Sequence, residues 1–230
     1  MSLKIVLILG AGPRVGAAVA EKFAGNGYKV ALASRKGSNS KNEKGYLSVK
    51  ADLAQPDSVS PAFDAVKTEF GASPSVVVYN AASLTPPPDP KSALSITSES
   101  FKSDLSINTI SAYVAAQNAI AGWETLPAEA KNSFIFTGNG LNTTVPPAAF
   151  MLTLGVGKSA SAYWLGVADA NYADRGYRFF YADERTESGG MKGLDLDGEA
   201  HGDFYAQLAA HEKNVPWHAT FVKGKGYVKF

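Results

Sequence analysis

Short apolar runs alternate with amphipathic stretches along the whole chain, and this alternation constrains the fold more than any other feature of the sequence. The first run, Ile5–Leu9, is continuous and apolar, as expected of a strand buried on both faces of a sheet. The other predicted strands are Lys29–Ala33, Tyr46–Lys50, Val76–Tyr79, Ser133–Thr137, Arg178–Ala182 and a last one near His218–Val222. The predicted helices between them are Val15–Asn26, Asp57–Phe70, Phe101–Gly122, Gly157–Tyr172 and Phe204–His211. This order predicts an α/β fold, a doubly wound parallel sheet of about seven strands with helices on both faces.

The chain shows no obvious linker or internal repeat, so we expect a single domain covering residues 1–230. A length of 230 residues is enough for one domain with a sizeable core. The formal net charge of +1 leaves no surplus of cations to neutralise a phosphate backbone, which argues against nucleic-acid binding. The absence of cysteine excludes disulfides, thiolate metal sites and cysteine nucleophiles. No segment approaches the length of a membrane-spanning helix, and we therefore expect a cytoplasmic protein without a membrane partner.

A glycine-rich turn, Gly10-Ala11-Gly12-Pro13-Arg14-Val15-Gly16, joins the first predicted strand to the first predicted helix. Glycines let the backbone turn sharply and approach a pyrophosphate, while the helix N-terminus supplies amide donors and a favourable dipole. An ordinary tight turn between a strand and a helix would also use glycine. At the start of an alternating chain, however, the turn favours the dinucleotide site of a Rossmann-type domain.

The end of the second predicted strand, Ser34-Arg35, indicates which dinucleotide is bound. An acidic residue there would accept hydrogen bonds from the ribose hydroxyls of NAD, whereas an arginine can pair with a 2′-phosphate. No Asp or Glu stands at this strand end. The prediction is NADP(H), with NAD(H) the disfavoured alternative and Arg14 a second candidate phosphate contact. The other interpretation is that Arg35 is a solvated residue opening a polar loop.

Several short motifs, taken in order, resemble the short-chain dehydrogenase/reductase family over nearly the whole chain. Gly10, Gly12 and Gly16 resemble its glycine-rich loop, with Arg14 in place of the middle glycine. The resemblance also covers Asp52-Leu53, Asn80-Ala81-Ala82 and Asn108, which match the family's adenine-contacting pair, its Asn-Ala-Gly motif and its active-site asparagine. It implies a cofactor-binding set of Gly10, Gly12, Arg14, Val15, Gly16, Ser34, Arg35, Asp52, Leu53, Asn80, Ala81, Ala82 and Lys158.

Each of these motifs also has a purely structural interpretation. Asp52 could cap the next turn, and Asn80 could satisfy loop backbone groups. Asn108 could bridge the backbone within its helix. The order of the motifs favours the functional interpretation over these alternatives.

The catalytic half of the resemblance is incomplete, so the resemblance implies a divergent member of that family. Lys158 looks like the family's lysine, which lowers the pKa of a catalytic tyrosine and holds the nicotinamide ribose, and Lys158 and Asn108 are the expected catalytic residues. The tyrosine should stand four positions earlier, but Leu154 is there and has no proton to give. Tyr163 lies five positions after Lys158 and would point well away from its face of a helix.

Two further departures fall in the same half. The serine position is missing from Thr137-Gly138-Asn139-Gly140, and Ala182-Asp183-Glu184-Arg185 replaces the family's Pro-Gly. Alternative proton sources are Tyr113, Tyr181 or a water held by Asn139. Lys158 could also bind the ribose and do no acid–base work.

The remaining polar residues suggest no metal. His201, His211 and His218 have no spacing that forms a metal site with nearby carboxylates. A substrate-side segment is expected at roughly 183–212; His201 could belong to a lid there, although a solvated loop histidine is the commoner case. Tyr163 and Trp164 are expected in the core or in a subunit interface, since the resemblance implies a homodimer or homotetramer.

Three functions remain open at this level. The first is an NADP(H)-dependent oxidoreductase that acts on a small carbonyl or alcohol substrate with an unusual proton donor. The second is an NADP(H)-binding sensor or regulatory subunit without redox turnover. The third is a repurposed enzyme that uses the old pocket without hydride transfer. The resemblance favours the first, and Leu154 counts against it.

Overall fold

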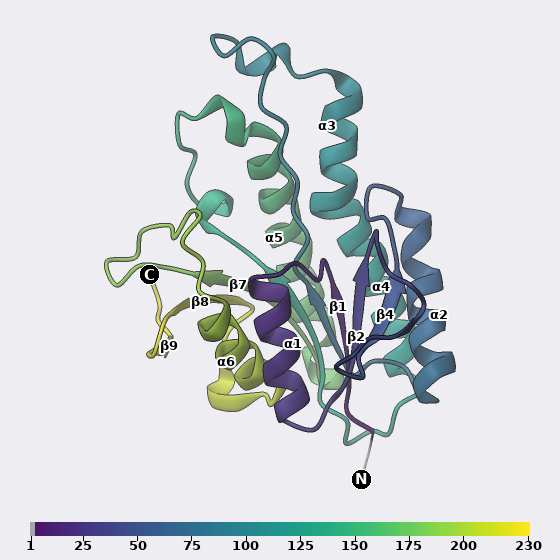
Figure 1. The fold of residues 1–230 in the computed structure, drawn as a ribbon. Coiled ribbons are helices and arrows are strands. Elements are labelled where there is room, and N and C mark those ends of the chain that lie inside the picture. The colour runs from purple at the N-terminus through teal and green to yellow at the C-terminus, as the bar shows by residue number, and fades with distance from the viewer. Residues whose placement is uncertain (1–2) are drawn as a thin grey trace.

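A nine-stranded sheet forms the centre of the protein in a computed structural model that describes residues 3–230 (Figure 1). The strands lie in the order β3-β4-β2-β1-β5-β6-β7-β8-β9, and all inner pairs are parallel. Their bounds are β1 Ile5–Leu9, β2 Lys29–Ser34, β3 Ser40–Lys41, β4 Leu47–Lys50, β5 Val76–Tyr79, β6 Asn132–Thr137, β7 Tyr177–Glu184, β8 His218–Val222 and β9 Gly226–Tyr227. The prediction of a doubly wound, Rossmann-type parallel sheet is confirmed.

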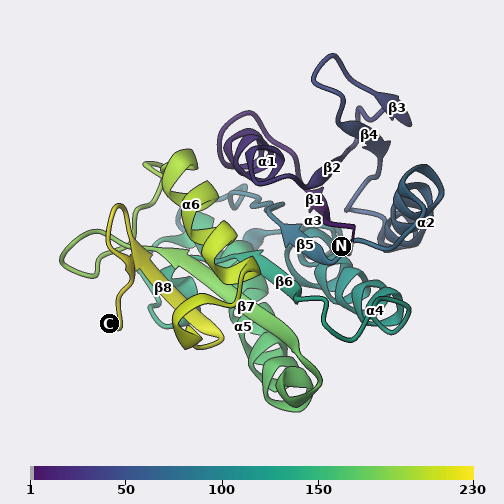
Figure 2. The same cartoon turned by 90° about the horizontal axis from the view of Figure 1, so that it is seen from below.

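Helices cover both faces of this sheet (Figure 2). Helices α1 (Val15–Gly25) and α6 (Gly198–Ala209) enclose one apolar core. Helices α2 (Val59–Phe70), α4 (Ser111–Trp123) and α5 (Leu152–Tyr172) enclose the other. Within residues 3–230, no helix is both long enough and apolar enough to cross a membrane.

The two strands beyond the predicted seven are two-residue antiparallel pairs at the edges of the sheet. Strand β3 lies within the stretch Lys36–Lys44, which was predicted to be a loop, and pairs with β4. Strand β9 pairs with β8. Neither has the apolar run that marks a buried strand, because an edge strand has a neighbour on only one side. The predicted count was wrong for this reason, while the strand Val76–Tyr79 was predicted to the residue.

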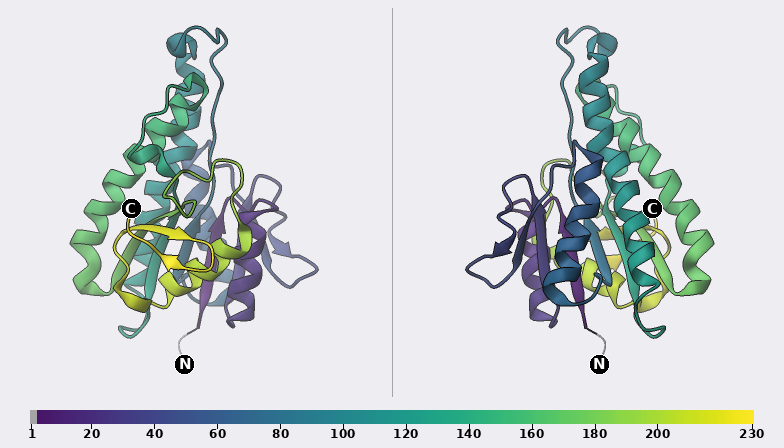
Figure 3. Two further views of the ribbon diagram at one scale, coloured as in Figure 1. Left: turned by 90° about the vertical axis from the view of Figure 1, so that its left-hand side faces the viewer. Right: turned by 90° about the vertical axis from the view of Figure 1, so that its right-hand side faces the viewer.

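The predicted helix Phe101–Gly122 is in fact three consecutive segments. Helix α3 (Ser98–Leu105) leads into a π-helical turn, Ser106–Ile110, which then continues as α4. Figure 3 shows α3 rising beyond the sheet, next to the start of α5. The π turn adds a residue to one helical turn and reorients the side chains within it, and such turns are frequent at functional sites.

Two other helices begin earlier than predicted. Helix α5 begins at Leu152 rather than Gly157, so Lys158 lies in its second turn. Helix α6 begins at Gly198 rather than Phe204, because the side chain of Asp197 accepts a hydrogen bond from the amide of Ala200 and caps the helix. Glycines at both N-termini lowered the apparent helix propensity, and tertiary packing overrode it.

Helix α5 packs against the π turn so closely that a glycine is needed at the contact. A Cβ atom placed on Gly157 would lie 2.3 Å from the Cβ of Asn108. Two residues earlier, a Cβ placed on Gly155 would meet nothing closer than the Cβ of Leu141, at 4.0 Å. Gly157 therefore sets the distance between α5 and Asn108.

These two glycines form a matched test of that packing. We expect Gly157→Ala to lower the free energy of unfolding by about 1–3 kcal/mol, because the added methyl forces the two segments apart. Gly155→Ala should raise it by about 0.5–1 kcal/mol, because alanine is the better helix former and meets no clash. Urea unfolding of both variants measures the two effects. Equal stabilisation by both would contradict the close contact.

Candidate functional site

The carboxyl ends of the parallel strands β1, β5 and β6 meet at one edge of the sheet, where the strand order reverses about β1. In open α/β sheets, ligands bind at this kind of switch point. Gly10 follows β1 with a φ of +89°, and a Cβ placed on it would lie 2.5 Å from the backbone nitrogen of Ala81. Glycine is therefore required there by both conformation and space.

The rest of the glycine-rich turn leads into α1. A Cβ on Gly16 would lie 2.9 Å from the Cα of Ala11, whereas one on Gly12 would meet no atom of residues 3–230 within 4 Å. Helix α1 begins at Val15 and has no acidic residue in its first turn. Its positive N-terminal end is thus open to an anion such as a pyrophosphate, and the turn could hold a dinucleotide. Gly12 is the glycine that leaves space there.

Arg14 stands at the N-cap position of α1, and its guanidinium donates to the carbonyl of Leu194 at 2.9 Å. This contact ties the glycine-rich turn to the segment between β7 and α6. No pattern in the sequence predicts this contact, because the two residues are 180 positions apart. Arg14 is exposed, so its side chain has room to turn toward a phosphate.

Residues predicted to meet the adenosine end lie at the ends of β2 and β4. Ser34 ends β2, and Arg35 is exposed in the turn that follows. The carboxylate of Asp52 accepts from the amide of Ala54 at 3.1 Å, the turn-capping role that was the structural alternative. Leu53 is buried, and its carbonyl accepts from the Ser111 hydroxyl at 2.7 Å.

Asn80 links three strand ends through its side-chain amide. Its nitrogen donates to the carbonyl of Gly10 at 2.9 Å, and its oxygen accepts from the Thr137 hydroxyl at 3.0 Å. The Tyr205 hydroxyl donates in turn to the Thr137 hydroxyl at 2.8 Å. Asn80 therefore satisfies loop backbone groups as well as lying at the site. Ala81 packs against Gly10, and Ala82 is exposed.

Asn108 is completely buried in the π turn. Its side-chain oxygen accepts from the amide of Ser83 at 2.8 Å, and its nitrogen donates to the carbonyl of Ser83 at 2.7 Å. Its own carbonyl accepts from the Ser161 hydroxyl of α5 at 2.9 Å. A buried carboxylate nearby, that of Asp104, accepts from the Ser83 hydroxyl at 2.6 Å. Asn108 thus holds the segment after β5 and α5 together.

Lys158 points from α5 into this buried region and is only 3% exposed. Its Nζ donates to the carbonyl of Thr137 at 2.6 Å and lies 4.4 Å from the ring centre of Phe136. Burial lowers the pKa of Lys158 to about 7, although attraction to Asp183 opposes the shift. Leu154, one turn earlier on α5, is partly buried and brings only hydrocarbon to this part of the helix.

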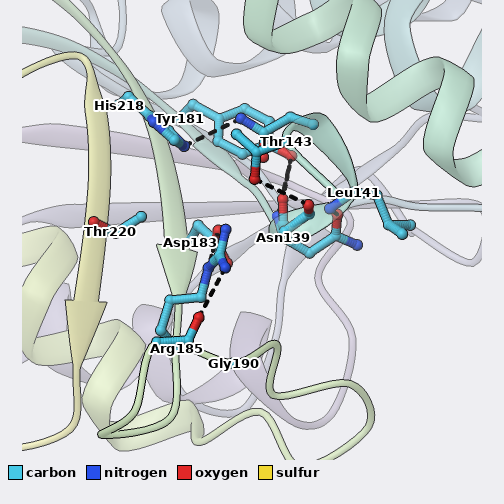
Figure 4. A network of polar contacts seen from close by, with 12 residues as sticks. Asn139, Leu141, Thr143, Tyr181, Asp183, Arg185, Gly190, His218 and Thr220 are labelled. Atoms are coloured by element: carbon cyan, nitrogen blue, oxygen red, sulfur yellow. Dashed lines mark hydrogen bonds and ion pairs between the residues drawn. The ribbon is translucent and has the colours of Figure 1, made fainter. Parts of the chain in front are cut away.

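The tyrosines considered as substitute proton donors lie elsewhere or are already bonded. Tyr163 is 78% exposed, and Tyr113 is half exposed with its ring edge against Trp164. Trp164 also packs on Phe134, as expected of a core residue, and a subunit interface at Tyr163 stays a prediction. The Tyr181 hydroxyl donates to the carbonyl of Asn139 at 2.8 Å and accepts from its amide at 3.1 Å (Figure 4). Burial raises the pKa of Tyr181 well above its ordinary value.

Two ionisable residues that the sequence placed beyond the sixth strand are part of it. Strand β7 runs to Glu184, and Asp183 and Glu184 are each 1% exposed. Arg185 Nε donates to the Asp183 carboxylate at 2.5 Å, and its Nη1 donates to the carbonyl of Gly189 at 3.0 Å. Burial raises the pKa of Asp183 to about 6, while the guanidinium of Arg185 opposes this shift. Charged residues at the end of a strand are usually exposed, so the sequence did not predict that Asp183 and Glu184 are buried.

The expectation of a solvated His201 was wrong. His201 is completely buried in α6, where its Nδ1 donates to the carbonyl of Asp197 at 2.6 Å. The same nitrogen lies 3.5 Å from a carboxylate oxygen of Glu184. Burial lowers the pKa of His201. Among residues 3–230, no three His, Asp or Glu side chains are grouped so that they could hold a metal ion.

A largely apolar hollow of about 610 Å³ lies beside the start of α5, between the loop near Pro90 and the residues that follow β6. Its lining includes Leu141, Val145, Met151 and Leu152, and also Lys91. Space of this size suits a small ligand with an apolar body.

Comparisons with known proteins agree with this architecture. Residues 10–139 match a family model described as enoyl-(acyl carrier protein) reductase. The chain is 42% identical to the short-chain dehydrogenase/reductase dmxR12 of Cryptosporiopsis sp. (strain 8999), over 100% of this chain and 96% of that protein. A short-chain dehydrogenase from Burkholderia cenocepacia J2315 in complex with NADP has a similar structure, with a TM-score of 0.71, 21% identity and 90% of each chain covered. So does the 3-ketoacyl-(acyl-carrier-protein) reductase of Brucella melitensis complexed with NADH, with a TM-score of 0.72, 19% identity and 96% and 97% of the two chains covered.

The two glycines of the turn differ in what a side chain would meet, and this difference can be tested. Gly10→Ala should lower the free energy of unfolding by about 1–3 kcal/mol, because alanine is strained at positive φ and would collide with Ala81. Gly12→Ala should leave stability within about 0.5 kcal/mol of the parent, because its position is open. Thermal unfolding of both variants provides the measurement. A Gly12→Ala variant as unstable as Gly10→Ala would show that the turn is packed differently.

Proposed function

The chain belongs to the short-chain dehydrogenase/reductase family, and we propose that it is an NADP(H)-dependent oxidoreductase that interconverts a small carbonyl compound and its alcohol. One observation carries this proposal. The glycine-rich turn at the N-terminus of α1 lies at the same sheet edge as Lys158 and Asn108, where Asn80 and Thr137 connect the strand ends. A phosphate-binding turn and a buried lysine thus meet at the switch point of the sheet.

The preference for NADP(H) over NAD(H) rests on the end of β2. Arg35 is exposed directly after Ser34, and no carboxylate stands at this strand end to accept from two ribose hydroxyls. A guanidinium there can bind a 2′-phosphate through paired hydrogen bonds. Structural neighbours of this chain were solved with NADP and with NADH, so the family alone does not select between the two.

The proposed division of labour follows the geometry. The turn from Gly10 to Gly16 would hold the pyrophosphate through backbone amides. Lys158 would hold the nicotinamide ribose, and Asn108 would keep α5 at its distance through the contact with Gly157. When bound, the nicotinamide gives or takes the hydride. The hollow near Leu141 and Leu152 supports a substrate with a small apolar body.

A second function is favoured by one residue. Leu154 occupies the position of the family's catalytic tyrosine, and it cannot exchange a proton with a substrate. A positioned acid or base contributes about 10²–10⁴ to the rate, so its loss without replacement would leave a cofactor-binding protein with little turnover. In that case the protein would be an NADP(H)-binding sensor or regulatory subunit.

Calorimetric titration of the protein with NADPH and separately with NADH tests the cofactor assignment. We expect tighter binding of NADPH, and Arg35→Ala should weaken it about 10- to 100-fold by removing a charge-assisted contact while leaving NADH binding unchanged. Lys67→Ala is the matched control. Lys67 is also an exposed cation, but it lies in the last turn of α2, which leads to the edge of the sheet opposite the glycine-rich turn. No binding of either nucleotide would refute the oxidoreductase and the sensor together.

Turnover then separates the two functions. Loss of NADPH absorbance with members of a panel of small apolar aldehydes and ketones is the result expected of the oxidoreductase. NADPH binding without consumption by any member of the panel would favour the sensor.

A further inference from the structure

A buried carboxylate, Asp183, lies on the same side of the sheet as Lys158. Side chains alternate along β7, and Tyr177, Phe179 and Tyr181 all enter the core that α4 and α5 cover. Asp183 continues this series, so its carboxylate points toward the α5 side of the sheet. Figure 4 shows it next to Arg185, at the strand end beside Asn139.

The hydrogen bond of the Asp183 side chain involves only one of its two carboxylate oxygens. One oxygen accepts from Arg185 Nε at 2.5 Å. Among residues 3–230 the other oxygen has no hydrogen-bond partner, and the side chain is 1% exposed. A buried carboxylate with a bare oxygen is costly unless a second cation offsets it. Lys158 is the candidate, because its Nζ donates to the carbonyl of Thr137, and Thr137 pairs across the sheet with Ala182, the residue before Asp183. The attraction between the two charges opposes the loss of the Lys158 proton.

Lys158 needs such a partner. Its ammonium is removed from water and donates one hydrogen bond to the carbonyl of Thr137, which leaves two N–H groups without an acceptor among residues 3–230. Burial would otherwise release the proton, whereas the Asp183 carboxylate opposes that release. The pKa of Lys158, at about 7, is the result of these two effects.

The other charged and titratable groups near the pair have different partners. Arg185 is bound to Asp183 and to Gly189, and Tyr181 is bound to Asn139. The Tyr205 hydroxyl, from α6, is bound to Thr137, and the carboxylate of Glu184 enters the opposite core, where it accepts from the amide of Asp197. Asp104, from α3, accepts from the hydroxyl of Ser83 through Oδ1, and among residues 3–230 its Oδ2 has no hydrogen-bond partner, but Asp104 is not among the charges that act on Lys158. Within the described chain, Asp183 is the carboxylate whose attraction acts on Lys158.

We propose that Asp183 is a positioning residue that holds the proton on Lys158, and that the Lys158 ammonium, in place of a tyrosine hydroxyl, gives this proton to the carbonyl oxygen of the substrate. The inference rests on the proposed oxidoreductase function. In the reduction, the carbonyl carbon receives a hydride from a reduced nicotinamide, which is oxidised, while the carbon–oxygen π bond breaks. The electron pair moves to oxygen, an N–H bond of Lys158 breaks and an O–H bond forms. The neutral amine then takes a proton from water, and alcohol oxidation follows the same steps in reverse.

Titration of Lys158 in the protein without cofactor tests the pairing directly. Lysine labelled with ¹³C at Cε gives one NMR signal per lysine, and the Lys158 signal is identified by its absence from Lys158→Met. Asp183→Asn should lower the pKa of Lys158 by about 1 unit or more, because the attracting charge is lost and the shape is kept. Glu187→Gln, which removes an exposed carboxylate from the same segment, should leave it unchanged.

Two further variants keep this test decisive if Asp183→Asn does not fold. Asp183→Glu retains the carboxylate and should keep the pKa of Lys158 close to that of the parent. Asp183→Ser also removes the carboxylate charge and should lower the pKa of Lys158, as Asp183→Asn does. An unchanged pKa in Asp183→Asn, or in Asp183→Ser if only that variant folds, would overturn the pairing.

The proton-donor role has its own test. Because the ammonium is the acid, kcat/KM for carbonyl reduction should fall as the pH rises through the pKa of Lys158, and Asp183→Asn should move that fall to lower pH. Lys158→Arg keeps the positive charge, but a guanidinium cannot release a proton at neutral pH. Its kcat, measured at saturating NADPH so that a changed hold on the cofactor does not enter, should drop about 10²–10⁴-fold.

The outcomes separate the two proposals. Full turnover in Lys158→Arg would overturn the donor role. A parent protein that binds NADPH but reduces no carbonyl would refute both the donor role and the proposed oxidoreductase. The NMR titration uses no cofactor or substrate, so it decides the Asp183–Lys158 pairing in either case.

Discussion

The side-chain amide of Asn80 connects the ends of three strands, and the arrangement of the site depends on it. It joins the Gly10 carbonyl to the Thr137 hydroxyl, and Tyr205 of α6 extends the chain of hydrogen bonds across the sheet. Because parallel strands end at a common edge, one short polar side chain there reaches its neighbours on both sides. These hydrogen bonds fix the glycine-rich turn after β1 relative to the end of β6, where the Thr137 carbonyl accepts a hydrogen bond from Lys158.

Close packing then determines the electrostatics around Lys158. Gly157 allows α5 to approach Asn108, and the next residue, Lys158, is carried out of water onto the carbonyl of Thr137. A lysine with its ammonium in such a place loses hydration that one hydrogen bond does not replace. The compensation that we propose is Asp183, a buried carboxylate on the neighbouring strand that is also bound to Arg185. The same burial that destabilises each charge makes their mutual attraction strong.

Sequence patterns located most elements because their signals are local. Continuous apolar runs marked β1, β5 and β6, and glycine spacing marked the turn into α1. Elements whose bounds depend on distant partners were misjudged. The N-terminus of α6 is set by the Asp197 cap and by packing on α1, where Gly198 lies close to Ala18. The charged end of β7 looked like a loop, because a sequence does not show that Arg185 will neutralise Asp183.

By itself the sequence determined the α/β architecture, the place of the glycine-rich turn and the presence of Lys158 without a tyrosine at position 154. These follow from periodicity and spacing, which act over a few neighbouring residues. Only the tertiary structure decided that Lys158 and Asp183 are both buried, that Arg14 reaches Leu194, and that His201 is enclosed rather than solvated. The reason is physical: burial and charge pairing depend on which distant segments the sheet brings together, and that information does not reside in any one stretch of the chain.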